Sequence, residues 1–403
     1  MIGNETPKRI LVADCLSHFG GVHRVMVNLL PILARSFDIR VVDPYGNAAY
    51  RKAMSRKGLA VADLGLGGRR PFIGGGRTWK RLFCMLKALP RLLKMRRGLA
   101  ETIVRFDPHY VYTNQQPMLR MLGRIAATRG RQLVYHAHGF GQWRDIQPSA
   151  VRILNAHDAI VMPVSDATGR QLCRAGVREE LIALCYNGVD VEEVERLADA
   201  GPQGPVPDKP TGQVVLLLPA TLQPAKGQHV AVEALARARR AGADVALWLA
   251  GDVAPGGDKT YLPSLQNASR EWGVADRVHF LGWRDDLFGV MTEADAVMLC
   301  SQEGESFGMV FAEAMVLRKP CLGPRIGGVP EVIDEEHTGL LFDPQSARDV
   351  AAAMHRVAAD EALRRRFGQA GRARVEACFT VAHQVARIAD ALNSATDTRT
   401  VPR

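Results

Sequence analysis

The sequence predicts an α/β protein of two doubly wound domains, each a parallel sheet with helices on both faces. The chain has 403 residues, more than one hydrophobic core usually serves. Residues 9–43 read as a strand, a glycine turn, a helix and a second strand, and this alternation restarts after the Pro- and Gly-rich segment 201–212. Parallel sheets bind ligands beyond the carboxyl ends of their strands, so two such domains facing each other would leave a cleft for substrates.

The expected elements alternate along the whole chain. In the first half, strands are expected at 9–16, 37–43, 109–114, 132–139 and 159–165, with a glycine turn at 17–24 and a helix at 25–36. In the second half, strands are expected at 214–220, 245–251, 277–283, 296–300, 320–324 and 339–342, and helices at 228–240, 262–273, 306–318 and 347–360. We therefore place the domains at 1–195 and 196–378, with a terminal helix and tail at 379–403. The segment 201–212 reads as an interdomain linker or an exposed loop.

Composition favours a globular cytoplasmic protein. Hydrophobic residues make up 47% of the chain and charged residues 23%, an ordinary balance. No leader-like segment and no apolar run long enough to span a bilayer is found. The seven cysteines are scattered without a C-x-x-C pair, which indicates reduced, buried thiols.

Positive charge is concentrated in the first quarter of the chain. Residues 1–100 hold 19 Lys and Arg against 5 Asp and Glu, about +14. Segment 77–98 has apolar residues at helical spacing and basic residues on another face, and we expect Pro90 to kink or split this helix. It is either an ordinary surface helix or an interfacial helix against anionic lipid, which would make the protein peripheral to the inner face of the membrane. A nucleic-acid partner is not expected, because no recognition module is present.

The stretch EGESFGMVFAEAM, residues 303–315, is the most informative one. It follows a strand and leads into a helix, with Ser306, Phe307 and Gly308 expected at the helix start, where free N–H groups favour a phosphate. Glu305 would stand just before the helix, and Glu313 about two turns inside it. Glu313 could accept both hydroxyls of a ribose; the alternative is a structural carboxylate bonded to a backbone turn.

A second strand–loop–helix unit carries a basic residue. Lys226 and Gly227 lie in the loop between the strand 214–220 and the helix 228–240. A lysine ammonium is a compact charge for phosphate, and a glycine lets the backbone pass close to a ligand. Taken alone, such a pair is more often a solvated turn.

Together these motifs resemble the E-x7-E signature of the retaining glycosyltransferases of family 4, also called group 1. Further matches are P-x-K-G-Q at 224–228, NGVD at 187–190, FLGW at 280–283, GGVPEVI at 327–333, GGVHR at 20–24 and HAHG at 136–139 with its preceding strand. The resemblance covers about residues 9–360. It implies the GT-B fold, two Rossmann-like α/β/α domains facing each other across a cleft, with the terminal helix crossing back to the first domain.

The resemblance also implies roles for matching residues. Glu305 corresponds to the carboxylate near the reacting carbon of the donor sugar, Glu313 to the ribose clamp and Lys226 to the cation on the leaving diphosphate. The phosphate cradle corresponds to the amides of Gly308, Met309 and Val310. Gly20 and Gly21 correspond to the loop that approaches the diphosphate, and His138 to the histidine that faces the sugar. No cofactor is implied beyond the nucleotide diphosphate sugar itself.

One position departs from the family. Thr221 stands where the family usually has an arginine, which removes half of the usual diphosphate clamp. Arg325 and Arg284 are candidates to substitute for it. The change also keeps open a non-catalytic sugar-nucleotide binding protein as an alternative.

The first glycine turn also imitates a dinucleotide site, with Asp43 as the ribose acid, but G-x-G-x-x-G is absent, so no nicotinamide is expected. His136 and His138 alternate along one expected strand and should point to opposite faces, which argues against a metal pair.

The expected reaction is transfer of a sugar from a nucleotide diphosphate sugar to an acceptor hydroxyl, with retention and without a metal. A lipid-linked or cell-envelope acceptor, as in polysaccharide, lipopolysaccharide or glycolipid synthesis, fits the basic helix. A nucleotide-sugar epimerase on the same fold is the alternative among enzymes.

Overall fold

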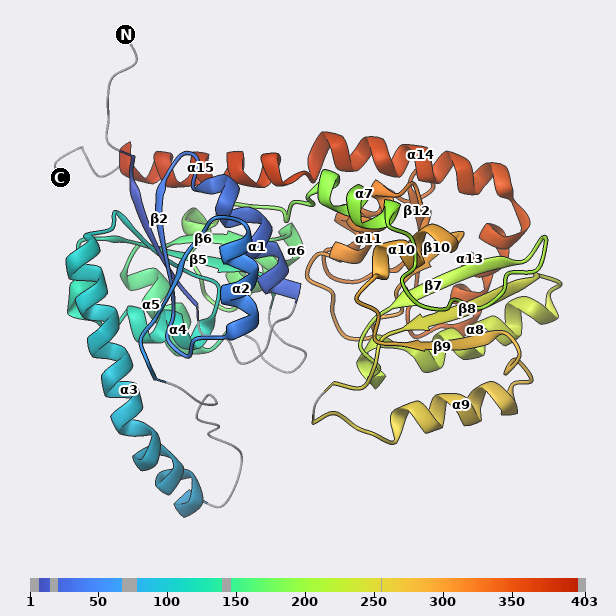
Figure 1. The fold of residues 1–403 in the computed structure, drawn as a ribbon, viewed down its shortest axis with the longest axis horizontal. Coiled ribbons are helices and arrows are strands. Elements are labelled where there is room, and N and C mark those ends of the chain that lie inside the picture. Colours follow the sequence, from blue (N-terminus) through green and yellow to red (C-terminus); the bar gives the residue numbers. More distant parts are fainter. Residues whose placement is uncertain (1–6, 15–20, 67–77, 140–145, 255, 398–403) are drawn as a thin grey trace, which may run out of the picture. The chain divides into compact units, whose positions relative to one another are not determined.

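The computed structural model describes residues 7–14, 21–66, 78–139, 146–254 and 256–397. The chain divides into two compact units (Figure 1), and each contains one six-stranded sheet. Unit 1 is Met1–Gly188 with Val381–Arg403, and unit 2 is Val189–Thr380. The prediction of two doubly wound α/β domains is confirmed. Unit 2 begins at residue 189, before the expected start of the second domain at 196.

The sheet of unit 1 is parallel throughout, in the order β3-β2-β1-β4-β5-β6. Its strand order reverses between β1 and β4, and this reversal point is where doubly wound sheets bind their ligands. The strands are β1 Arg9–Ala13, β2 Asp38–Asp43, β3 Val61–Asp63, β4 Tyr110–Thr113, β5 Gln132–Ala137 and β6 Ile160–Pro163.

Two hydrophobic cores cover the two faces of this sheet. Successive side chains of a strand point to opposite faces, so Ile10 and Val12 join one core while Leu11 and Ala13 join the other. The first core includes residues of α1, α2 and α15, and the second includes residues of α3, α4 and α5. The helices of unit 1 are α1 Gly21–Leu33, α2 Ala48–Arg56, α3 Thr78–Phe106, α4 Gln116–Leu122, η1 Ala126–Thr128, α5 Pro148–Ala156, α6 Asp166–Arg174, η2 Glu179–Leu181 and α15 Val381–Asp397.

The last helix of the chain, α15, is an integral part of unit 1. Ile388 and Leu392 are fully buried in the core that contains α1 and α2. The hydroxyl of Tyr110 in β4 donates a hydrogen bond to the Leu392 carbonyl at 2.7 Å. Unit 1 is therefore completed by residues that follow the whole of unit 2 in the sequence.

The sheet of unit 2 repeats the same order, β12-β11-β10-β7-β8-β9, and reverses between β7 and β10. Helices α8, α9 and α13 pack together, and α7, α10, α11 and α14 form a second group. The strands are β7 Val214–Pro219, β8 Val245–Ala250, β9 Val278–Gly282, β10 Ala296–Met298, β11 Cys321–Pro324 and β12 Gly339–Phe342. The helices are α7 Val191–Asp199, η3 Pro224–Lys226, α8 Gln228–Arg240, α9 Tyr261–Glu271, α10 Leu287–Glu293, α11 Met309–Val316, α12 Val329–Val332, α13 Ala347–Ala359 and α14 Glu361–Cys378.

Residues 78–98 of the basic segment form the amino-terminal part of α3, the long helix labelled in Figure 1, and residue 77 lies outside the described residues. Pro90 lies inside α3 and does not split it, contrary to one of the outcomes expected from the sequence. Met95, Leu99 and Ile103 are buried in unit 1, whereas Leu89 and Leu93 are 47% and 56% exposed. Within the described residues, no helix has the length and apolar character needed to cross a membrane.

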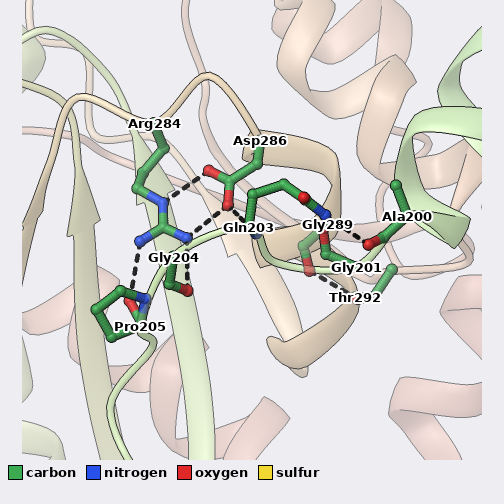
Figure 2. Close-up of polar contacts among 9 residues, drawn as sticks. All are labelled: Ala200, Gly201, Gln203, Gly204, Pro205, Arg284, Asp286, Gly289 and Thr292. Atoms are coloured by element: carbon green, nitrogen blue, oxygen red, sulfur yellow. Dashed lines mark hydrogen bonds and ion pairs between the residues drawn. The ribbon is translucent and has the colours of Figure 1, made fainter.

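The Pro- and Gly-rich segment 201–212 lies within unit 2, so it is a surface loop rather than an interdomain linker. Arg284 holds its start, as Figure 2 shows: the guanidinium donates to the carbonyls of Gly204 and Pro205 and pairs with Asp286 at 2.6 Å. That pairing lowers the pKa of Asp286 to about 2. The Asp286 carboxylate also accepts the Gln203 backbone N–H.

Truncation of Leu392 tests the contribution of α15. Leu392→Ala leaves a cavity in the core of unit 1, so we expect the free energy of unfolding of that unit to fall by about 2–5 kcal/mol. Urea denaturation measures it. The control is Asp390→Ala, an exposed position of the same helix, which should change stability by less than about 0.5 kcal/mol. Equal stability of the two variants would show that α15 does not stabilise unit 1.

Candidate functional site

Two loops meet where the strand order of unit 2 reverses. Lys226 stands in the loop after β7, and Glu305 stands in the loop after β10; these strands are neighbours in the sheet. Because both loops leave the carboxyl edge of a parallel sheet, they lie at the position that favours ligand binding in this architecture. The structure therefore brings together two of the residues that the sequence singled out.

Lys226 and Glu305 form an ion pair. The Lys226 Nζ lies 2.8 Å from the Glu305 Oε2, and the two side chains are 24% and 19% exposed. The Ser301 hydroxyl donates to the same carboxylate oxygen at 3.0 Å, and Lys226 Nζ lies 3.4 Å from that hydroxyl. The sequence predicted both charged residues but neither their contact nor Ser301. The position of Ser301, the first polar residue after the apolar run 296–300, is the signal that could have found it.

Gly227 allows the first loop to approach the second. Its φ is +68°, a left-handed conformation, and a Cβ at this position would lie 2.0 Å from the Cys300 carbonyl oxygen. The Gln302 backbone N–H donates to the Ala225 carbonyl at 2.8 Å, which joins the two loops directly. Lys226 is thus placed by backbone contacts that only glycine permits at the next residue.

Gly327 has the same role on the other side of Glu305. Its φ is +54°, and a Cβ there would lie 2.0 Å from the Glu305 carbonyl oxygen. The neighbouring Gly328 donates its backbone N–H to that oxygen at 2.9 Å. The GGVPEVI stretch therefore fixes the backbone of Glu305, and Gly327 is the position in it that requires glycine.

Helix α11 begins later than predicted. It starts at Met309, and Gly308 precedes it in a left-handed conformation with φ +88°. The first N–H groups of a helix have no partner within it, so Met309 and Val310 present donors at this edge. Glu313 is the fifth residue of the helix, so the expected position two turns inside was wrong. Its side chain is half-buried, between the fully buried Ala312 and Ala314.

Phe307 belongs to the core rather than to the ligand edge. Its side chain is 2% exposed and its ring meets that of Phe379 edge to face, with centroids 5.5 Å apart. The side chain of Phe307 therefore does not face a ligand at the helix start. Ser306 is half-buried.

The two arginines proposed to replace the missing family arginine are engaged elsewhere. Arg284 is held by Asp286 and the 201–212 loop, as described above. Arg325 makes a two-fold hydrogen bond with Glu335 and lines a cavity of about 600 Å³ near α13. The residues lining that cavity do not include Lys226 or Glu305. At position 221 itself, the Thr221 carbonyl accepts a hydrogen bond from the Gln228 side chain at 3.0 Å.

In unit 1, the prediction that His136 and His138 point to opposite faces was wrong. Strand β5 ends at Ala137, so the alternation does not extend to His138, and the two rings stack with centroids 4.1 Å apart. Burial, and secondarily the nearby His23, lowers the pKa of His138 to about 3, and burial also lowers that of His136. Both rings are therefore neutral at physiological pH.

The other expectations for unit 1 concern the first glycine turn, Asp43 and metal binding. Gly21 is the first residue of α1, while Gly20 lies outside the described residues. The Asp43 carboxylate accepts backbone N–H groups of Tyr45 and Asn47, so it closes a local turn. In the part of the chain that the structure describes, no group of three or more His, Cys, Asp and Glu side chains is placed to hold a metal ion.

Family models match both halves of the chain. Residues 203–374 match the model described as "Glycosyl transferases group 1", and residues 19–193 match the model described as "Glycosyltransferase Family 4". The first match contains Lys226, Glu305 and Glu313. The second contains His138 and Gly21.

Two curated relatives illustrate the range of similarity. The chain is 30% identical over 317 residues to a GDP-mannose-dependent α-(1-6)-phosphatidylinositol monomannoside mannosyltransferase of Mycobacterium tuberculosis, covering 74% of this chain and 78% of that protein. It is 39% identical over 99 residues to the N-acetyl-α-D-glucosaminyl L-malate synthase of Bacillus anthracis. That second match spans 25% of this chain and about a quarter, 26%, of the relative's own length.

Among solved structures, HepE from Anabaena in complex with UDP and glucose has the same fold. The TM-score is 0.76, the sequences are 24% identical, and the match covers 96% of this chain and 99% of that one. The likeness extends over both units and establishes the two-domain architecture.

Substitution of Gly327 tests how Glu305 is held. Gly327→Ala introduces a Cβ into the space of the Glu305 carbonyl at a left-handed position, so we expect the free energy of unfolding of unit 2 to fall by about 1–3 kcal/mol. Gly304→Ala, in the loop that carries Glu305, is the control, because a Cβ there meets no atom within 4 Å. Chemical denaturation of both variants measures the difference. Equal stabilities would contradict the proposed constraint on Glu305.

Proposed function

The chain belongs to the group 1 glycosyl transferases and has their two-domain GT-B fold, and from this premise we propose its reaction. It transfers a sugar from a nucleotide diphosphate sugar to an acceptor hydroxyl, with retention of the anomeric configuration. The observation that carries this proposal is the contact of Lys226 with Glu305 at the point where the strand order of unit 2 reverses. A cation for a diphosphate and a carboxylate for a sugar lie side by side there.

The diphosphate is the leaving group, so negative charge develops on its oxygens. In the proposal, Lys226 and the N–H groups that begin α11 stabilise this charge, because fixed donors act without reorganisation. These groups take the role that a metal ion has in other phosphate sites, and the proposed mechanism uses no metal. The left-handed Gly308 lets the backbone turn into the helix at this point.

The ion pair suggests how the donor engages the site. In the structure, Glu305 is the partner of Lys226. A diphosphate would compete for the ammonium, since an anion with two or more charges is the stronger partner. Glu305 would then be free to accept hydroxyls or stabilise positive charge on the sugar as the glycosidic bond breaks. Glu313 as the ribose clamp, and His138 as the residue near the sugar, stay predictions from the family.

The identity of the base and sugar is proposed from the relatives. HepE was solved with UDP, and the mycobacterial relative is named as GDP-mannose-dependent. We therefore propose UDP- or GDP-linked hexoses as the first donors to test. An epimerase would bind the same donors, and it is distinguished because it changes the donor without an acceptor.

The acceptor is proposed to be membrane-associated. Leu89 and Leu93 lie one helical turn apart on α3 and are both well exposed, and the exposed Lys87, Arg91 and Lys94 surround them. An amphipathic surface of this kind buries leucines below lipid headgroups while its cations meet anionic lipid. This supports a lipid-linked acceptor in cell-envelope polysaccharide, lipopolysaccharide or glycolipid synthesis.

Separate substitutions of the two ion-pair partners test the reaction. Lys226→Met removes the diphosphate cation, so the thermal shift given by UDP or GDP should shrink, with affinity falling roughly tenfold or more. Glu305→Ala should keep that thermal shift but lose at least roughly a hundredfold in donor turnover, since its contact is made in the transition state. Full turnover by Glu305→Ala would sink the assignment, and no nucleotide shift in the wild type would remove the donor proposal itself.

Vesicle sedimentation tests the membrane surface. Wild-type protein should sediment with vesicles containing anionic lipid at low salt, and Leu89→Ser/Leu93→Ser should weaken this by more than roughly tenfold, because each buried leucine contributes about 1.5–3 kcal/mol. Leu184→Ser, another exposed leucine of unit 1, is the control and should bind as wild type does. Binding that is insensitive to the double substitution would mean that α3 is an ordinary surface helix.

A further inference from the structure

Polar residues follow three adjacent strands of unit 1, β1, β4 and β5. Asp14 comes directly after β1, Asn114 directly after β4 and His138 directly after β5. In the register of β1 and β4, Val12 pairs with Tyr112, so Asp14 and Asn114 occupy matching positions two residues further on. The strand order of this sheet reverses between these two strands. Asp14, Asn114 and His138 thus form a row at the edge where a doubly wound sheet binds its ligand.

Asn114 has no hydrogen-bond partner for either end of its carboxamide. Its side chain is 8% exposed, and among the described residues neither Nδ2 nor Oδ1 is paired. The Asp14 Oδ1 and the His138 Nε2 are also buried and have no hydrogen-bond partner among the described residues. Buried polar atoms are nearly always paired in folded proteins, because an unpaired one loses its hydration without compensation. A set of such atoms in one row therefore indicates groups whose partner is a ligand.

The surroundings of Asn114 carry little charge. His136 and His138 are neutral, and Tyr112, which contacts His136 through its hydroxyl, has a pKa raised well above its usual range by burial. Burial raises the pKa of Asp14 to about 7, although its hydrogen bond from Tyr50 opposes this. Nearby titratable groups include Tyr50, with a raised pKa, Cys185, with a pKa of about 12, and Asp43, bonded to turn amides. His23 is also buried nearby and contributes to the lowered pKa of His138.

This character selects the chemistry of the ligand. Phosphate binding needs cations or an array of backbone N–H groups, whereas neutral imidazoles and carboxamides both donate and accept hydrogen bonds. Hydroxyl groups also do both. The row is therefore matched to uncharged hydroxyl groups rather than to an anion.

We propose that Asn114 is a specificity-determining residue that hydrogen-bonds the hydroxyls of an uncharged sugar ring in unit 1. Its carboxamide can donate through Nδ2 to one hydroxyl and accept at Oδ1 from the next. The proposal rests on the proposed glycosyl transfer and deepens it, since the ring is either that of the acceptor or that of the transferred sugar. His138 and Asp14 flank Asn114 as further partners for the same ring.

The test uses Asn114→Leu, which keeps the side-chain volume and removes both polar atoms. The matched control is Thr128→Val in η1, which precedes β5; Thr128 is fully buried, and its hydroxyl is also unpaired among the described residues. Two binding measurements are made on each protein with UDP or GDP present. One is saturation-transfer NMR of methyl α-glucopyranoside and methyl α-mannopyranoside, with glucose 6-phosphate for comparison. The other is the affinity gained by UDP-glucose over UDP and by GDP-mannose over GDP.

The expected result is a loss of roughly tenfold to hundredfold in sugar affinity for Asn114→Leu and none for Thr128→Val. If Asn114→Leu loses only its affinity for the free glycosides, the ring is that of the acceptor. If it also loses the extra affinity of the nucleotide sugar over the nucleotide, the ring is that of the transferred sugar. Sugar binding by Asn114→Leu within twofold of wild type overturns the proposal. The proposal is also overturned if wild-type protein binds neither glycoside and binds the nucleotide sugar no more tightly than the nucleotide. A wild-type preference for glucose 6-phosphate over the glycosides would overturn it as well.

Thermal unfolding separates a binding role from a structural one. Removing an unpaired buried carboxamide should leave the Tm of Asn114→Leu equal to or above that of wild type. A clearly lower Tm, with sugar binding reduced only in proportion to the folded fraction, would make Asn114 structural and overturn the proposal. Absence of any nucleotide thermal shift would instead count against the proposed function, while the glycoside measurement still decides the role of Asn114.

Discussion

The close passage of two backbone segments against residues 300–308 is the constraint on which the site of unit 2 depends. The segment containing Gly227 lies against the Cys300 carbonyl, and the segment containing Gly327 lies against the Glu305 carbonyl. Neither approach leaves room for a Cβ, and both glycines have left-handed backbones. The Lys226–Glu305 ion pair is a consequence of this packing, because the side chains start from backbones that are already fixed.

The carboxyl edges of the two sheets differ in the charge of the residues that they carry. In unit 2 the groups are charged and partly exposed, as in Lys226 and Glu305, and they suit a diphosphate and a sugar cation. In unit 1 the corresponding edge carries neutral histidines and an unpaired carboxamide, which suit hydroxyls. In the two proposals, the same strand order supports two kinds of recognition, and the difference comes from the residues that follow the strands rather than from the topology.

Several expectations failed where a side chain's direction or partner depends on distant residues. His138 was placed by strand alternation, but the strand ends one residue before it, and the ring stacks on His136 instead. Arg284 was a candidate to replace the missing family arginine, yet its donors are used by Asp286 and by a loop some eighty residues earlier in the chain. Local pattern gives the type of a residue and its element, but the partner of a long side chain is set by packing.

The sequence by itself determined the two parallel sheets, most strand positions and the loops that carry Lys226 and Glu305, because hydrophobic periodicity and glycine placement are local signals. It also identified the glycine-rich stretches at 227 and 327 without showing what each glycine contacts. Only the tertiary structure decided that those glycines lie against Cys300 and Glu305, that α15 completes unit 1 and that Asn114 is buried without a partner. The physical reason is the same in each case: these are contacts between residues far apart in the chain, and no local pattern encodes which surfaces will meet.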